Sequence, residues 1–174
     1  LWKNKNKYYD IWSGLMKVLY TGSFDPITMG HMDIINRISK IFDEIVVTVF
    51  NNIDKKYWFD IEERCEMVRQ ATKHLNNVSV DYTGGLVVDY CEKNNINLIV
   101  RGLRAVSDYE YELAISSINK HLNKKLETIF LVASAEYSFL SSSMVKDVAE
   151  NGGNFEDLVP EYAVQEIHKK LGRN

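Results

Sequence analysis

One short stretch of the chain combines a hydroxyl, an imidazole and a glycine-containing loop, which are groups that proteins use to bind and transfer phosphates. Residues 20–31 read YTGSFDPITMGH, after a short apolar run and before a segment with helical spacing. A strand that leads through a Gly/Pro loop into a helix presents backbone N–H groups to an anion. Gly22 permits close backbone approach or a positive φ, Ser23 supplies the hydroxyl, and His31 comes at the helix start. An ordinary turn with a surface histidine is the alternative interpretation.

Two further segments could contact the same anion. Residues 101–104 (RGLR) follow an apolar run, and residues 137–143 (YSFLSSS) lead into a helix that carries Lys146. Three serines at a helix start offer hydroxyls and N–H groups to phosphate oxygens, although N-capping alone needs only one of them. Lys55 and Lys56 follow another apolar run and could add a cation, or they could be solvated loop lysines.

Apolar periodicity predicts strands that alternate with helices. The strands are expected over residues 17–20, 44–50, 78–82, 97–100 and 127–132, and the helices over 32–42, 60–75, 86–93, 107–122, 141–150 and 160–171. Residues 60–63 and 107–110 both resemble capping boxes that open a helix. Such alternation indicates βαβ units and a parallel sheet.

The predicted fold class is therefore α/β: a doubly wound, Rossmann-like parallel five-stranded sheet, of order 3-2-1-4-5, with helices on both faces. In that order the first and fourth strands are neighbours at the topological switch point, and ligands bind beyond the carboxyl ends of such strands. We therefore expect the loop over residues 21–31 and the loop over residues 101–104 to face one crevice.

Composition limits the classes of partner. A chain of 174 residues with net charge −3 favours a single domain, here residues 16–174, and argues against nucleic acid as a partner, which needs a basic face. No apolar run is long enough to span a membrane, so we expect no membrane partner. Cys65 and Cys91 stand alone, without metal-ligand spacing, which indicates buried thiols in a reducing cytoplasm and no metal site built from protein ligands.

Residues 1–15 differ from the rest of the chain. They mix lysine, asparagine and aromatic residues without a period, and no apolar segment follows that would make them a signal peptide. We interpret them as a disordered, vector-derived or upstream-translated extension, with a short interaction arm as the alternative.

Three motifs in this order, GSFDPITMGH, RGLR and the segment Tyr137 to Lys146 with its SSS-x-x-K core, resemble the nucleotidyltransferases that carry an H-x-G-H-type signature. More narrowly, they resemble the bacterial phosphopantetheine adenylyltransferases. Thr28 stands at the first histidine of the signature, as is usual in that family. The resemblance extends over residues 16–171.

The resemblance implies a reaction in coenzyme A biosynthesis. ATP and 4′-phosphopantetheine would give dephospho-coenzyme A and pyrophosphate, by direct in-line attack and with Mg²⁺ accompanying ATP. It also implies a homohexamer and a cytoplasmic location.

The resemblance further implies roles for individual residues. His31 would stabilise the transition state. The residues implied for ATP binding are Ser23, Phe24, His31, Gly102, Leu103, Arg104, Glu112, Tyr137, Ser138, Phe139, Leu140, Ser141, Ser142 and Ser143. Those implied for the acceptor are Ser23, Lys55, Val87 and Arg101.

Two other functions share some of these features. A nicotinamide mononucleotide adenylyltransferase or a cytidylyltransferase would have the same fold and first motif, but RGLR with SSS-x-x-K favours the pantetheine enzyme. A catalytically silent nucleotide-binding module is the other alternative. The presence of His31, Lys55, Arg101 and Arg104 together argues against it.

Overall fold

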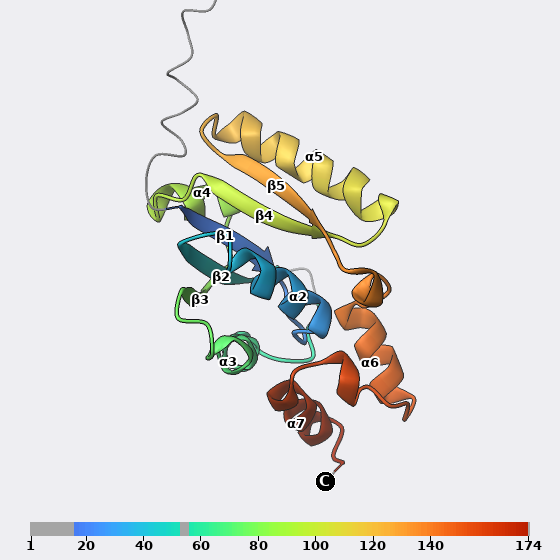
Figure 1. Ribbon diagram of the computed structural model, residues 1–174. Coiled ribbons are helices and arrows are strands. Elements are labelled where there is room, and N and C mark those ends of the chain that lie inside the picture. The colour runs from blue at the N-terminus through green and yellow to red at the C-terminus, as the bar shows by residue number, and fades with distance from the viewer. Residues whose placement is uncertain (1–15, 53–55, 174) are drawn as a thin grey trace, which may run out of the picture.

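A computed structural model describes residues 16–52 and 56–173. The expectations for residues 1–15 and for Lys55 fall outside this described part and stay predictions. Figure 1 shows one five-stranded sheet, whose order β3-β2-β1-β4-β5 confirms the predicted doubly wound topology. All four strand pairs are parallel. The strands are β1 (Lys17–Gly22), β2 (Glu44–Phe50), β3 (Val78–Thr83), β4 (Leu98–Leu103) and β5 (Glu127–Val132).

Helices cover both faces of this sheet (Figure 1), as predicted. They are α2 (Met29–Ile38), α3 (Ile61–Thr72), α4 (Val87–Lys93), α5 (Val106–Leu122), α6 (Ser142–Glu150) and α7 (Glu161–Lys170), with 3-10 turns η1 (Ala135–Tyr137) and η2 (Glu156–Leu158). One core packs α2, α3, α6 and α7 against the sheet. On the opposite face a smaller core packs α4 against it, and α5 lies against β4, β5 and α4.

The central strands are buried on both faces, which is why their sequences read as apolar runs rather than alternating ones. Along β1, Val18 and Tyr20 belong to the larger core, whereas Leu19 between them belongs to the smaller one. The predicted buried thiols are confirmed. Cys65 and Cys91 are both buried and unpaired, and burial raises the pKa of Cys91 to about 12.

The predicted fourth strand ends too early. The β4–β5 ladder continues through Arg101, Gly102 and Leu103, so these residues lie on the strand and not in the loop after it. The predicted helix over 32–42 is also displaced along the sequence: α2 begins at Met29, because Thr28 caps it, and ends at Ile38. Both shifts bring their motifs onto regular elements, which fixes their side chains more firmly than a loop would.

One of the two predicted capping boxes is wrong. The box at Asp60 is confirmed, since its carboxylate accepts from the N–H of Glu63 over 2.8 Å. At residues 107–110, however, α5 begins at Val106 and its N-cap is Ala105, without a side-chain cap. The carboxylate of Asp108, in the first turn of α5, accepts from the backbone N–H and the Nε of Arg104.

Candidate active site

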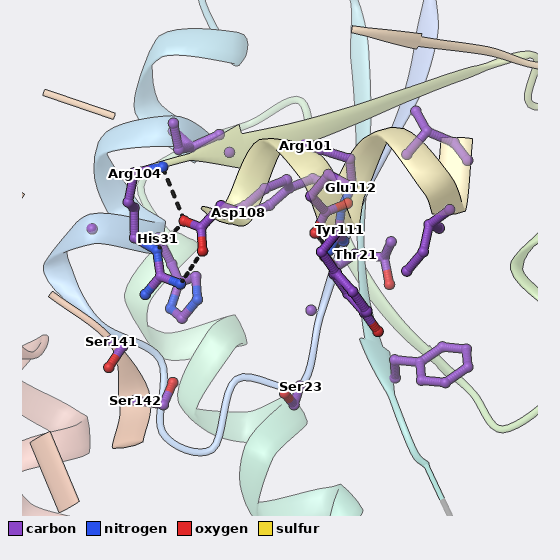
Figure 2. Close-up of a pocket in the computed structure, with 18 of the residues that line it drawn as sticks. Thr21, Ser23, His31, Arg101, Arg104, Asp108, Tyr111, Glu112, Ser141 and Ser142 are labelled. Atoms are coloured by element: carbon purple, nitrogen blue, oxygen red, sulfur yellow. Dashed lines mark hydrogen bonds and ion pairs between the residues drawn. The ribbon is translucent and has the colours of Figure 1, made fainter. Parts of the chain in front are cut away.

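A cavity of about 740 Å³ lies at the carboxyl ends of β1 and β4, at the predicted switch point. Figure 2 shows side chains from β1, α2, β4, α5 and α6 around it. Of the residues predicted for the site, Ser23, His31, Val87, Arg101, Gly102, Arg104, Glu112, Tyr137, Leu140, Ser141, Ser142 and Ser143 line this cavity. Phe24, Leu103, Ser138 and Phe139 are not among the described residues that line it.

The loop after β1 is shaped by a buried aromatic ring. Phe24 is 1% exposed and has a left-handed backbone, with φ of 47°. Its ring lies edge-on to His31, with centroids 5.0 Å apart. A Cβ on Gly22 would stand only 3.0 Å from this ring. Gly22 is therefore needed for a close side-chain approach, and the positive φ falls on Phe24.

His31 has a fixed tautomer. It is the third residue of α2, where its Nδ1 accepts the backbone N–H of Thr28 over 3.0 Å. A backbone N–H can only donate, so in the neutral ring the proton lies on Nε2. Thr28 completes a reciprocal capping box, because its Oγ1 accepts the backbone N–H of His31. His31 therefore presents an oriented N–H donor at a helix N-terminus.

The environment keeps this imidazole neutral. Burial, and then the nearby Arg104 and Arg101, lower the pKa of His31 from 6.5 to about 3. A ring with so low a pKa is a poor general base near neutral pH. It remains a good hydrogen-bond donor to a developing negative charge.

Arg101 and Glu112 form a bidentate ion pair across the cavity wall. Nε of Arg101 donates to Glu112 over 2.7 Å, and Nη2 donates to the other carboxylate oxygen. Nη1 of Arg101 also donates to the carbonyl of Thr21. Three of the five guanidinium N–H groups are thus used by these partners. The pair joins α5 to the ends of β4 and β1 (Figure 2).

Arg104 connects the start of α5 to the segment before α6. It donates to both carboxylate oxygens of Asp108, over 3.0 and 3.2 Å, as Figure 2 shows with dashed lines. Its Nη1 also donates to the carbonyl of Leu140 over 3.0 Å. Burial alone would raise the pKa of Asp108, but the hydrogen bonds and charge of Arg104 lower it.

The three serines before α6 have different partners. Ser141 is the N-cap, accepting the N–H of Met144 over 3.1 Å. Ser142 donates to the carbonyl of Pro26 over 2.8 Å, which ties α6 to the loop after β1. Ser143 lines the cavity in the first turn of α6. Capping therefore accounts for only one of the three, as the sequence suggested.

Lys146 of the same motif is a structural cation. Its Nζ lies 2.8 Å from the carboxylate of Asp25, which is 3% exposed. Asp25 also accepts the backbone N–H groups of Trp58 and Phe59. One buried carboxylate therefore joins the loop after β1, the segment before α3, and α6.

Sequence reasoning missed the contribution of α5. Besides Glu112, the helix lines the cavity with Asp108, Tyr111, Ile115, Ser116 and Asn119. Their spacing of three to four residues marks one helix face, and that periodicity was the available signal. With a rise of 1.5 Å per residue, this face spans about 16 Å along the helix.

Two kinds of feature are absent from the described residues. Residues 16–52 and 56–173 contain no group of three or more His, Cys, Asp or Glu side chains able to hold a metal ion. Within the same ranges, no helix is long and apolar enough to cross a membrane.

Comparison with known proteins identifies the family. Residues 19–148 match the cytidylyltransferase-like family. A Vibrio parahaemolyticus protein described as a nicotinate-nucleotide adenylyltransferase has a similar structure, with TM-score 0.67 and 16% identity over 91% of this chain and 96% of that one. The Plasmodium falciparum nicotinic acid mononucleotide adenylyltransferase, solved with NaAD, has TM-score 0.66 and 16% identity, over 90% and 96%. Both of these structures have the same fold as this chain. The family match means that the chain belongs to the cytidylyltransferase-like family.

Proposed function

We propose that this nucleotidyltransferase transfers the adenylyl group of ATP to 4′-phosphopantetheine, giving dephospho-coenzyme A and pyrophosphate. The chemistry rests on His31, a neutral and oriented Nε2–H donor at the start of α2. Arg101 and Arg104 bring two guanidinium groups to the same cavity, and Ser141 to Ser143 bring three hydroxyls. Such a set suits the transfer of a phosphoryl-type group.

The proposed step is a single displacement at the α-phosphorus of ATP. An oxygen of the acceptor phosphate forms a bond to this phosphorus while the bond to the bridging oxygen of the β-phosphate breaks, and pyrophosphate leaves. Negative charge grows on the α-phosphate oxygens during the step, and His31 would donate to one of them. The acceptor oxygen is already largely ionised near neutral pH, given a second phosphate pKa of about 6, so no general base is required.

The shape of the cavity is the observation that favours phosphopantetheine as the acceptor. From the guanidinium of Arg101 the cavity continues along α5, past Ile115 and Ser116, to Asn119. Apolar side chains together with a hydroxyl and an amide suit a long acceptor that carries amide groups. In this arrangement the two remaining N–H groups of Arg101 would bind its phosphate, and Val87, which also lines the cavity, would contact the arm. The contribution proposed for Lys55 lies outside the described residues.

Magnesium enters the proposal together with ATP. Mg²⁺ commonly binds through substrate phosphates, waters and one or two carboxylates. The described residues offer no metal-binding cluster, and the cavity carboxylates of Asp108 and Glu112 are each paired with an arginine. We therefore assign the ion to the Mg·ATP substrate and derive no step from it.

A second acceptor is suggested by the similar structures, whose names specify nicotinate mononucleotide adenylyltransferases. At 16% identity, structural similarity alone does not assign the substrates of those proteins to this chain. An acceptor mononucleotide would place an aromatic ring, rather than a flexible arm, in the part of the cavity beside α5.

Parallel incubations separate the acceptors. The protein is incubated with Mg·ATP and 4′-phosphopantetheine, nicotinate mononucleotide or nicotinamide mononucleotide, and with CTP in place of ATP, and the products are identified by mass spectrometry. We expect dephospho-coenzyme A and pyrophosphate, with His31→Ala as the inactive control. Preferential formation of a dinucleotide would replace this proposal with the mononucleotide function. ATP binding without turnover on any acceptor would support a silent binding module.

We also propose that the chain assembles as a homohexamer. Large apolar side chains stand exposed on α5, and exposed apolar surface commonly marks an interface. Apart from Tyr111, which lines the cavity, they are Val106, Tyr109, Leu113, Ile118 and Leu122. Light scattering at micromolar concentration should give about six times the monomer mass. A monomeric mass would reject the assembly without touching the proposed reaction.

A further inference from the structure

We propose that Arg64 is a positioning residue for the adenylyl transfer. It holds the backbone in place at Ser23 and at Phe50, the end of β2. This inference rests on the proposed function. Arg64 belongs to α3, is only 1% exposed, and is the largest fully buried side chain in the described part of the chain. It is not among the residues that line the cavity.

The guanidinium is buried without an acidic partner among the described residues. A buried cation is costly unless its donors are satisfied. Arg64 meets this requirement with oxygens that are mostly backbone carbonyls. Nη1 donates to the carbonyls of Ser23 over 3.0 Å and Phe50 over 3.2 Å, and Nη2 donates to the side-chain oxygen of Asn51 over 2.8 Å.

These contacts set the direction of a peptide group in the loop after β1, the one between Ser23 and Phe24. The carbonyl of Ser23 points to Arg64, and in a planar trans peptide the N–H lies antiparallel to the carbonyl. The N–H of Phe24 is therefore turned away from Arg64. Phe24 has φ of 47°, a conformation that is unfavourable for an aromatic residue and that needs surrounding contacts to persist. Arg64 supplies one of these contacts directly.

Arg64 also organises the wall next to β2. Its guanidinium carbon lies 3.8 Å from the ring centroid of Tyr57, and the hydroxyl of Tyr57 accepts the backbone N–H of Asn52 over 2.8 Å. Phe50, Asn52 and Tyr57 all line the cavity. One buried cation thus holds the loop after β1 and the segment after β2 in a fixed relation.

This placement predicts an unequal effect on the two substrates. Among the described residues around the cavity, Arg64 contacts those on the β1 and β2 side, whereas Arg104 and the serines before α6 form the other side. Those residues are assigned to ATP and make no contact with Arg64, whereas Ser23 is assigned to both substrates and Phe24 to ATP. Loss of Arg64 should therefore disturb acceptor alignment and turnover more than ATP binding.

The test compares Arg64→Met and Arg64→Lys with a matched control, Arg173→Met. Arg173 also donates to backbone carbonyls, those of Ala149 and Glu150, but it does not line the cavity. Steady-state kinetics with both substrates and calorimetric ATP binding are measured for each variant. We expect Arg64→Met to lower kcat/KM for the acceptor at least tenfold, with the Kd for ATP changed less than threefold, and Arg64→Lys to recover part of the loss. Arg173→Met should change neither quantity.

A further variant covers the case in which Arg64→Met does not fold. Asn51→Ala removes only the contact to Nη2, and it should produce a smaller loss in the same direction. Unchanged kinetics in a folded Arg64→Met or in Asn51→Ala, or equal losses for ATP and acceptor, would overturn the inference. If the wild-type protein itself forms no product, the proposed function fails first, so the two failures are distinguishable.

Discussion

The two ring nitrogens of His31 have separate tasks, and amide substitutions can separate them. Nδ1 accepts the N–H of Thr28, and Nε2 is the donor assigned to the transition state. The amide oxygen of asparagine is bonded to Cγ, as Nδ1 is in histidine, so it can replace Nδ1 as an acceptor. The amide nitrogen of glutamine reaches the position of Nε2 and can replace it as a donor. His31→Asn therefore keeps the helix cap, and His31→Gln keeps the catalytic donor.

The expected magnitudes follow from these two contacts. Loss of one preorganised donor to the transition state typically costs about 2.7–4 kcal/mol, or roughly 10²–10³ in kcat. Loss of the Thr28 hydrogen bond should cost only about 0.5–1.5 kcal/mol of stability, a fall in Tm of about 1–6 °C for a domain of this size. We expect His31→Ala to suffer both losses. His31→Asn should lose mainly kcat, and His31→Gln mainly Tm.

The assay is steady-state turnover with Mg·ATP and phosphopantetheine, together with thermal unfolding and ATP binding for each variant. His31→Gln should exceed His31→Ala in kcat by at least tenfold, with ATP affinity nearly constant because the contact strengthens mainly in the transition state. A His31→Gln variant that folds and binds ATP normally but is as inactive as His31→Ala would refute the donor role. An inflection in kcat between pH 6 and 7 that disappears in His31→Gln would instead indicate a general base, which a pKa of about 3 does not allow.

Three other predictions concern acid stability, the buried pair of Lys146 with Asp25, and the pair of Arg101 with Glu112 in the cavity wall. The pKa of His31 is about 3 in the folded chain, against an ordinary 6.5. Between these values the unfolded chain binds a proton that the folded chain does not, so the free energy of unfolding falls as pH drops through this window. Denaturant unfolding should show a smaller fall for His31→Gln. Lys146→Met leaves the carboxylate of Asp25 buried without its cation and should lower the free energy of unfolding by about 3–5 kcal/mol in denaturant unfolding. Adding Asp25→Asn to Lys146→Met should restore part of that stability. Equal stability of the single and double variants would contradict the pairing. Arg101→Lys loses the bidentate contact with Glu112 and should lower kcat/KM for the acceptor roughly tenfold to hundredfold, whereas a loss confined to ATP would contradict its assignment.

Local patterns in the sequence were sufficient for the architecture. Apolar runs such as residues 44–50 identify strands that are buried on both faces, and the alternation with helices leaves few possible topologies, because parallel crossovers are right-handed. The predicted order then placed the motifs after β1 and β4 at one switch point, where the structure has its cavity. His31, Arg101 and Arg104 were found in this way.

Local patterns were misleading at two places. Residues 107–110 match a capping box, but α5 begins before them, at Val106, with Ala105 as its N-cap. Gly22 was the natural candidate for a positive φ, yet the left-handed residue is Phe24, whose ring occupies the space that Gly22 leaves open. The choice depends on which contact the folded chain brings closer, and a pattern of a few residues does not contain that information.

Only the tertiary structure decided how the site is supported. Arg64 meets the carbonyl of Ser23 across 41 positions of the chain, and Lys146 meets Asp25 across 121. Contacts between such distant residues leave no period or spacing in the sequence, since they arise when separate βαβ units pack against one sheet. The sequence therefore determined which side chains can carry the chemistry, and packing at the carboxyl ends of the strands determined which buried charges hold them in place.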